Sequence, residues 1–415
     1  MSTATPASPP DAPLPDAIGK SVLLLSLACF TSMASQRFCD AMLPELSRQF
    51  DSPLAATAQV VSAFALTYGL TQLFFGSLGD RYGKLRVIAY TLLGSAAGNV
   101  LAALAPSLDL LVAARVLAAA CAAAIIPLAL AWTGDAVPYA RRQETLARVG
   151  LGTTMGIFSG QFIGGLITDT VGWRWAFALL TVLFLLMGIL VQLHRRDHQV
   201  AVAAPAAGGV SLMAQTRELL RDGWVRKMLG FSLLQGAAGF GMMALVASHL
   251  HQLHGLSLSS AGAIVALMGL GGVSFMATAK HVIARLGESG MALMGGLGMA
   301  LALVVLALSP WWPITPLAML LGGFFFFMLH NTLQALATQM APQARGVGVS
   351  MFATTLFLGQ ALGVALAAAL IDRVGSALVL CGAAGVMLAI GTMLHLQLRK
   401  RARALAVGGP PAARH

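Results

Sequence analysis

The sequence predicts an all-α membrane protein with twelve transmembrane helices arranged as two pseudo-symmetric six-helix bundles. Of its 415 residues, 58% are hydrophobic and 10% are charged, whereas a soluble domain carries about 25% charged residues. Apolar stretches of about 20 residues, the length of a helix that crosses a bilayer, recur from residue 20 almost to the end. Because only short loops remain between them, we expect function to reside among the membrane helices. The sequence therefore indicates neither an enzyme nor a cofactor.

The apolar stretches define two sets of six predicted helices. The first bundle, residues 20–194, contains helices at 20–43, 56–78, 87–106, 109–133, 145–170 and 174–194. The second bundle, residues 228–397, contains helices at 228–252, 258–284, 289–309, 315–338, 346–371 and 374–397. Residues 195–227 form the predicted cytoplasmic linker, whose second part mixes apolar and charged residues and is expected to lie along the membrane surface. Residues 1–19 and 398–415 are predicted cytoplasmic tails, the first of them disordered.

The distribution of basic residues predicts the orientation of the helices. Three of the 26 Lys and Arg residues lie on one side of the membrane (Arg48, Arg174 and Arg373), two lie inside spans, and the remaining 21 lie on the other side. Basic residues favour cytoplasmic loops, so both termini are expected in the cytoplasm of a bacterial-type inner membrane. The net charge is +11. Because the basic segments alternate with the spans along the chain, they do not form a nucleic-acid-binding face.

Neither the cysteines nor the histidines suggest a metal site. The four cysteines all fall within predicted spans and share no short spacing, so they predict no disulfide framework and no metal cluster. His249 and His251 are two residues apart and cannot share a helix face. We expect no metal.

The two bundles resemble each other in sequence. Three short motifs occur in both bundles in the same order: Arg81–Gly83 with Arg285–Gly287, Pro138–Arg141 with Pro342–Arg345, and Gly160–Gly164 with Gly359–Gly363. The first two pairs are both separated by 204 residues. This agreement favours a duplicated six-helix unit, and two related halves around a central site are typical of rocking transporters.

The loop after the second helix carries glycines and charges in close succession: Gly76, Asp80, Arg81, Gly83, Lys84 and Arg86. This segment resembles the loop motif of the major facilitator superfamily, and the resemblance extends over the chain through the twelve spans and their six-plus-six division. In that family the loop aspartate caps a helix of the opposite half and pairs with arginines, which latches the outward-open state. The resemblance implies that Asp80 faces the N-terminus of helix eleven, where the helix dipole favours a carboxylate. It also implies that Arg81 reaches Asp135. The alternative is that these charges only enforce topology.

Helix four contains a charge deep in an apolar span, Arg115. A charged side chain at that depth costs about 2.5–3.5 kcal/mol on insertion scales and usually marks function. Arg115 is similar to the family's helix-four arginine, which is linked to proton coupling and to the binding of anionic or polar groups, although Ala119 stands where that motif has glycine. The alternative is an arginine that only ties helices together.

Helix one contains the other buried charges, Arg37 and Asp40. Spaced by three, they share a helix face and can pair. Asp40 followed by Pro44 resembles a pattern of the drug:proton antiporter branches, and the chain as a whole resembles these and the sugar-efflux-type branches. Burial favours the protonated form of a carboxyl group, so Asp40 is the predicted proton-coupling residue, with Arg37 and Arg115 as its partners. A pair at the membrane interface is the alternative.

Helix five carries a glycine at every fourth position, with one more glycine following: Gly152, Gly156, Gly160, Gly164 and Gly165. Such a stripe allows another helix to approach closely. It resembles the glycine-rich antiporter motif, although Gln161 stands where that motif has proline. Polar residues in the spans are the predicted lining of a substrate cavity: Tyr68, Gln72, Gln161, Gln235, His330, Asn331, Gln334 and Gln360.

These features favour a secondary transporter, acting as a monomer in the lipid bilayer, that exports small organic molecules such as drugs or metabolites in exchange for protons. One alternative is a proton-coupled uptake symporter for a sugar or an organic acid. Another is a transport-inactive membrane sensor or scaffold. An ATP-driven pump is disfavoured because Gly83-Lys84 lacks both the upstream glycine and the following Ser or Thr of a phosphate-binding loop.

Overall fold

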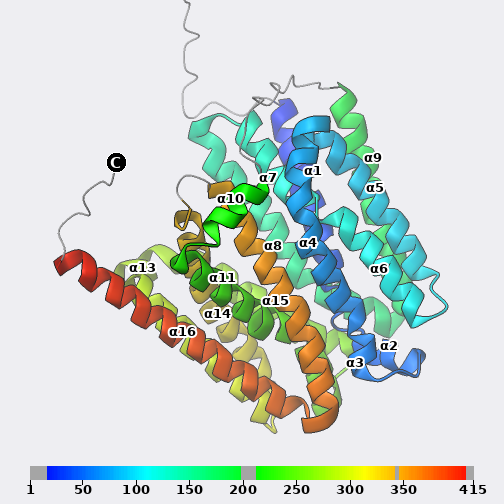
Figure 1. The fold of residues 1–415 in the computed structure, drawn as a ribbon. Coiled ribbons are helices and arrows are strands. Elements are labelled where there is room, and N and C mark those ends of the chain that lie inside the picture. The colour runs from blue at the N-terminus through cyan, green and yellow to red at the C-terminus, as the bar shows by residue number, and fades with distance from the viewer. Residues whose placement is uncertain (1–15, 198–211, 342–344, 408–415) are drawn as a thin grey trace, which may run out of the picture.

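The computed structural model describes residues 16–197, 212–341 and 345–407, and within these ranges the chain forms helices and connecting turns without a β-strand (Figure 1). The predicted N-terminal tail up to residue 15, linker residues 198–211 and the C-terminal tail from residue 408 lie outside the described residues. Residues 342–344 of the second Pro-x-Ala-Arg motif lie outside them as well.

The N-terminal half consists of α1 (Asp16–Arg37), α2 (Leu43–Gln49), α3 (Leu54–Thr57), α4 (Gln59–Tyr82), α5 (Lys84–Ala103), α6 (Leu108–Ala122), α7 (Ile125–Ala136), α8 (Tyr139–Thr170) and α9 (Trp173–Asp197). The C-terminal half consists of α10 (Leu212–Leu219), α11 (Gly223–Gln235), η1 (Gly236–Gly241), α12 (Met242–His254), α13 (Leu258–Leu308), η2 (Trp312–Ile314), α14 (Thr315–Gln339), α15 (Arg345–Val374) and α16 (Ser376–Val407). In Figure 1 the two halves stand side by side, the first from blue to green and the second from green to red.

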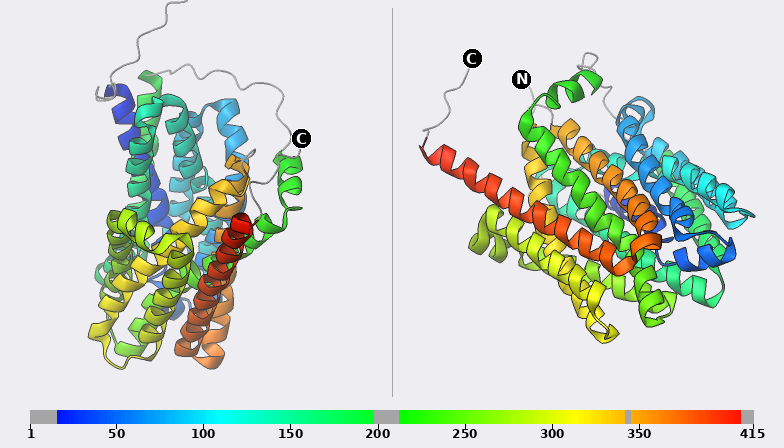
Figure 2. Two further views of the ribbon diagram at one scale, coloured as in Figure 1. Left: turned by 90° about the vertical axis from the view of Figure 1, so that its left-hand side faces the viewer. Right: turned by 60° about the horizontal axis from the view of Figure 1, so that its bottom comes forward.

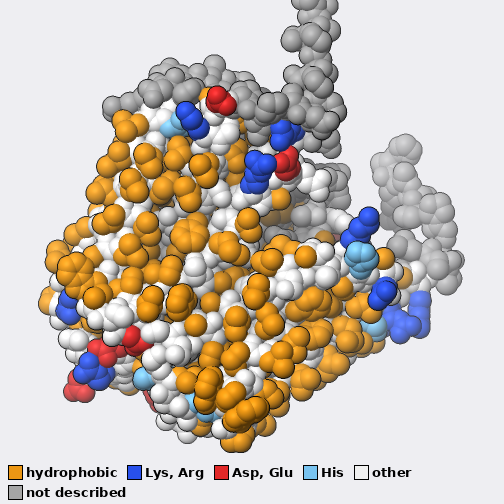
Figure 3. Space-filling view, turned by 180° about the vertical axis from the view of Figure 1, so that it is seen from behind, with side chains coloured by type: hydrophobic (Ala, Val, Ile, Leu, Met, Phe, Trp, Pro, Cys, Tyr) orange, Lys and Arg blue, Asp and Glu red, His pale blue; other side chains and the backbone are white. Residues whose placement is uncertain are grey.

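The long helices account for the predicted spans. Ten helical segments of the described chain are long and apolar enough to cross a membrane. One of them, α13, contains two predicted spans joined at Gly287, whose backbone (φ 63°, ψ 173°) is not helical. The predicted fifth span, α8, is not among the ten because its glycine, serine and threonine residues lower its hydropathy. Hydrophobic side chains cover most of the face in Figure 3, and charged ones gather toward its edges, as expected for a membrane-embedded surface.

Several spans are interrupted inside the bilayer. The expectation of one continuous helix over 20–43 is wrong, because α1 ends at Arg37 and residues 38–42 form turns before α2 begins. Pro44 occupies the first turn of α2; a proline is favourable there but would break a helix that continued through it. The fourth span is divided into α6 and α7, and the seventh contains the π-helix η1. Such π segments are frequently found at functional sites.

The halves approach each other closely toward one end of the molecule. A Cβ added to Gly165 of α8 would lie 2.5 Å from the carbonyl oxygen of Leu258 in α13, so the two backbones touch there. Nearby, Asp169 accepts hydrogen bonds from the backbone N–H of Ser259, at 2.6 Å, and from its hydroxyl. The short helix α3 also contacts α15 at this end (Figure 2). The loop that connects α4 and α5 lies at the opposite end of α4.

Candidate functional site

The turn after α1 holds an ion pair in the interior. Arg37 Nη1 lies 3.3 Å from Asp40 Oδ2, and the side chains are 1% and 0% exposed. Because α1 ends at Arg37, the carboxylate of Asp40 lies beyond the end of the helix and not on its face. Gln161 of α8 donates a hydrogen bond from Nε2 to the same carboxylate oxygen at 2.6 Å.

The Arg37 side chain connects the two halves. Its Nη1 also donates to the carbonyl oxygen of Phe240 at 2.9 Å, and its guanidinium lies 5.1 Å from the centroid of the Phe240 ring. Phe240 belongs to the π-helix η1, and the wider hydrogen-bond register of a π-helix changes which carbonyls are available to outside donors. A second link between the halves runs from Gln36 Nε2 to Gln360 Oε1 at 3.2 Å.

Arg115 is buried next to this cluster, and its partners carry no negative charge. It donates to the carbonyl oxygens of Ser35, at 2.9 Å, and Val60, at 3.4 Å, and to the Ser35 hydroxyl at 3.4 Å. Its guanidinium lies 3.9 Å from the centroid of the Phe64 ring, a cation–π distance. Arg115 therefore attaches α6 to the end of α1 through Ser35, which directly precedes Gln36.

Two predicted cavity residues of the C-terminal half are hydrogen-bonded to each other. His330 of α14 and Gln235 of α11 are joined through Nδ1 and Oε1 at 3.0 Å. The ring of His330 also stacks on that of Phe326, at 5.8 Å between centroids, and lies 5.7 Å from the ring of Phe240. Phe240 therefore lies between His330 and Arg37. The His330–Gln235 pair thus belongs to the same buried network as Arg37 and Asp40.

The remaining predicted cavity residues lie apart from the charge cluster. Gln72 donates to Thr354 of the opposite half at 3.3 Å. The ring of Tyr68 packs against that of Phe357 at 4.8 Å. Asn331 is half-buried and Gln334 is exposed, and neither forms a side-chain hydrogen bond with the other described residues.

The residue that sequence reasoning missed is Gln36. The stripe glycines Gly160 and Gly164 approach Ala34 and Phe38, and their equivalents Gly359 and Gly363 approach Leu233 and Ala237. All of these pairs are related by an offset of 199 residues. The same offset relates Gln161 to Gln360 and Gln36 to Gln235. The repeated Gly-Gln motif was therefore a signal that could have identified Gln36.

The loop motif forms an ion-pair network around a different residue than expected. Lys84 Nζ lies 2.8 Å from Asp80 and 2.7 Å from Asp135, and the two carboxylate side chains are 51% and 50% exposed. The expectation that Arg81 reaches Asp135 is therefore wrong, because the lysine at the start of α5 occupies that position while the Arg81 guanidinium lies 5.2 Å from the Tyr82 ring. Asp80 forms no hydrogen bond with the described part of α15, and residues 342–344, which precede this helix, lie outside the described residues.

The glycine stripe of helix five packs against α1. Cβ atoms added to Gly152, Gly156, Gly160 and Gly164 would lie 2.1–2.6 Å from backbone oxygens of α1 and the turn that follows it. Gly165 faces the other way and contacts α13 of the opposite half. The stripe thus holds the helix that carries Gln161 against the chain segment that carries Arg37 and Asp40.

The architecture and the intramembrane charges can be compared with known proteins. The profile of the Major Facilitator Superfamily matches residues 25–364, which is most of the chain. The chain belongs to the Major Facilitator Superfamily. It is therefore a multi-pass membrane transporter and not an enzyme.

Individual superfamily relatives are distant. The chain is 26% identical over 155 residues to the uncharacterized transporter YwfA of Bacillus subtilis, covering 37% of this chain and 38% of YwfA. It is 25% identical over 152 residues to the riboflavin transporter RibZ of Clostridioides difficile, covering 37% of this chain and 33% of RibZ. The chain thus aligns with between a third and two fifths of the length of these two relatives. YfhI of Bacillus subtilis is 22% identical over 397 residues, covering 92% and 96%.

Solved superfamily structures share the fold. A bacterial homolog of the human lysosomal transporter Spinster, in an inward-facing and unoccupied conformation, superposes with a TM-score of 0.76 at 17% identity, covering 94% of this chain and 98% of that one. The nucleoside transporter NupG superposes with a TM-score of 0.74 at 14% identity, covering 91% and 99%. At these identities the likeness shows the architecture of a superfamily transporter, while the substrate has to be inferred from the site.

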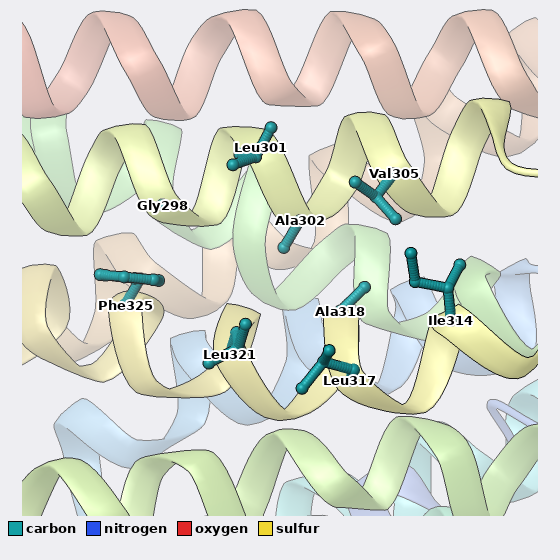
Figure 4. Close-up of a pocket in the computed structure, with 9 residues that line it drawn as sticks. All are labelled: Gly298, Leu301, Ala302, Val305, Ile314, Leu317, Ala318, Leu321 and Phe325. Atoms are coloured by element: carbon teal, nitrogen blue, oxygen red, sulfur yellow. The ribbon is translucent and has the colours of Figure 1, made fainter.

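A groove on the surface of this superfamily member lacks the polar groups of a substrate-binding site. It lies between the second part of α13 and α14 (Figure 4), and its lining residues are Gly298, Leu301, Ala302, Val305, Ile314, Leu317, Ala318, Leu321 and Phe325. These side chains offer no polar group that could orient a substrate. Leu301 and Leu317 are more than half exposed, as expected for a surface that contacts lipid.

Proposed function

We propose that this transporter exports small organic molecules in exchange for protons, and that the exchange depends on Asp40. The observation that supports this most directly is the position of the carboxylate. It is fully buried and accepts from Arg37, and the same Arg37 nitrogen donates to Phe240 of the opposite half. Arg37 therefore connects Asp40 directly to Phe240 of the opposite half. Alternating access has to break this contact between the halves, and a change of charge on Asp40 would affect it.

The proposed coupling follows from this connection. With Asp40 ionised, its charge holds Arg37 in place, and Arg37 holds η1 of the opposite half. Protonation removes that attraction and leaves Arg37 free to reorient, which weakens the link between the halves. Arg115, fixed by Ser35, Val60 and Phe64, keeps a permanent positive charge nearby that favours later loss of the proton.

The proposed direction of transport has separate support. Asp40 with Pro44, together with the glycine stripe, resembles the antiporter branches of the superfamily, although Gln161 departs from the antiporter motif. The partial match to a riboflavin transporter is compatible with a small organic substrate. The cytoplasmic position of both termini, inferred from the basic loops, defines which side of the membrane is the inside.

The proposal is tested with everted membrane vesicles that are energised by a pH gradient and screened against a panel of small organic compounds. We expect accumulation by the wild-type protein, none by Asp40→Asn with substrate binding retained, and impairment of both by Arg115→Ala. Asp109→Asn is the matched control, since Asp109 is an exposed carboxylate in the first turn of α6.

Two results would contradict the proposal. Gradient-driven accumulation by Asp40→Asn would place the proton site elsewhere, and His330 would be the next residue to test. Accumulation in right-side-out vesicles but not in everted ones would replace export by proton-coupled uptake.

A further inference from the structure

The interior of the protein contains more positive than negative charge. Among the described residues, the charged side chains that are less than a tenth exposed are Arg37, Asp40, Lys84 and Arg115. Lys84 lies at the loop end and is paired with two carboxylates. Two guanidinium groups and one carboxylate therefore remain around the turn after α1. Because a buried charge is costly unless it is paired, this arrangement favours a further anion.

The two arginines differ in how completely they are satisfied. Arg115 is surrounded by two carbonyl oxygens, a hydroxyl and an aromatic ring. Arg37 is equally buried, yet its Nε has no hydrogen-bond partner. Of the two, Arg37 is thus the group that has a free donor for a ligand.

Two more free donors belong to the opposite half. Gln360 and Gln235 are 2% and 0% exposed, and the Nε2 atom of each lacks a partner while its oxygen is engaged. Gln360 contacts Gln36, the neighbour of Arg37, and Gln235 contacts His330, which packs on Phe240. The three donors therefore belong to one connected network at the junction of the halves. The free acceptors, Asp40 Oδ1 and Gln161 Oε1, belong to the N-terminal half.

An excess positive charge and three unpaired N–H donors match the needs of a carboxylate, which has two oxygens and forms charge-assisted hydrogen bonds with guanidinium groups. Apolar rings adjoin the donors: Phe240, Phe326, Phe327 and Phe352 all lie within 6.2 Å of the His330 ring, between centroids. These rings suit a ligand with an apolar body next to its charged group.

We propose that the transported molecule is an organic anion with an apolar body, whose carboxylate is held by Arg37 of one half and by the side-chain amides of Gln235 and Gln360 of the other. The ligand thus contacts the arginine of the pair whose aspartate is the proposed proton site. This inference deepens the proposed function and rests on it for the statement that the bound molecule is transported.

The test is binding to the purified full-length protein in detergent, followed by thermal unfolding. The probes are matched triplets that share one apolar body: benzoate, benzamide and benzylamine, and hexanoate, hexanamide and hexylamine. We expect the carboxylates to raise the unfolding midpoint and the amides and amines to leave it unchanged. Arg37→Gln should weaken carboxylate binding about tenfold or more, because a charge-assisted bond becomes a neutral one. Gln360→Ala should weaken it by a smaller factor.

Arg48→Gln is the control for the charge change, because Arg48 is an exposed arginine paired with Glu45 on the surface. The inference is overturned if no carboxylate stabilises the wild-type protein, if amides or amines stabilise it equally, or if Arg37→Gln retains wild-type affinity. The wild-type comparison stands even if a variant does not fold. Carboxylate binding without gradient-driven transport would refute the proposed function alone. Gradient-driven export of cations without carboxylate binding would refute this inference alone.

Discussion

Replacing a stripe glycine by alanine should separate α8 from α1. A Cβ at Gly156 would lie 2.3 Å from the carbonyl oxygen of Phe30, where an ordinary contact begins at 3.4 Å, so the helices would have to move apart by 1.1 Å. The obstructing atom belongs to a helix backbone and cannot rotate away. Overpacking of this kind typically destabilises a protein by about 1–3 kcal/mol, which is about a 5- to 150-fold change in the unfolding equilibrium.

Gly150 provides the matched control on the same helix. A Cβ there would meet nothing within 4 Å, and alanine is favoured over glycine in a helix by about 1 kcal/mol. Thermal unfolding of the purified variants, followed by size-exclusion chromatography of the heated protein, should therefore show Gly156→Ala below the wild-type midpoint and Gly150→Ala at or above it. Equal midpoints for the two variants would refute the reasoning that the stripe is a backbone contact.

Three further predictions concern topology and the two ends of the molecule. A reporter that is active only in the periplasm should be silent after His415 and active near Pro310, and activity at the C-terminus would overturn the proposed orientation. Asp80→Asn should insert normally but transport poorly, with the cavity biased toward the cytoplasm by a factor of up to about thirty, since a carboxylate at a helix terminus contributes about 0.3–2 kcal/mol; wild-type transport would reduce the motif to a topology signal. Asp169→Asn should increase the labelling of a cysteine introduced at the buried Leu258 by an impermeant maleimide, because the charge that caps α13 is lost, and unchanged labelling would show that this cap does not hold the end closed.

Hydropathy and spacing were sufficient for the architecture because both are local properties of the chain. Runs of apolar residues mark segments that bury their own backbone hydrogen bonds in lipid, and glycines spaced by four fall on one helix face. The helix that the stripe contacts, α1, could not be derived in this way. Its identity depends on which helices become neighbours in three dimensions.

The details of the charge cluster lay beyond sequence reasoning for a related reason. Arg37 and Asp40 were expected on one helix face, and the structure instead places Asp40 in a turn, for which Pro44 was the available signal. The pairing of Asp135 with Lys84 was not predicted, because Arg81, Lys84 and Arg86 are so close to one another in the chain that the sequence does not show which of them meets Asp135. The links from Arg37 to Phe240 and from Gln36 to Gln360 join residues more than 200 positions apart. No periodicity encodes such contacts.

The duplicated framework has lost its symmetry at the charged positions. The offset that relates the glutamines of the two halves places Gly236 opposite Arg37 and Gly239 opposite Asp40. A Cβ at Gly236 would lie 2.1 Å from the carbonyl oxygen of Leu356, and one at Gly239 would lie 2.4 Å from the ring of Phe326. The second copy therefore has no space to regain an arginine or an aspartate by single substitutions. Divergence has thus given the two copies different roles at these positions, a buried arginine–aspartate pair in the first and close packing of glycines in the second.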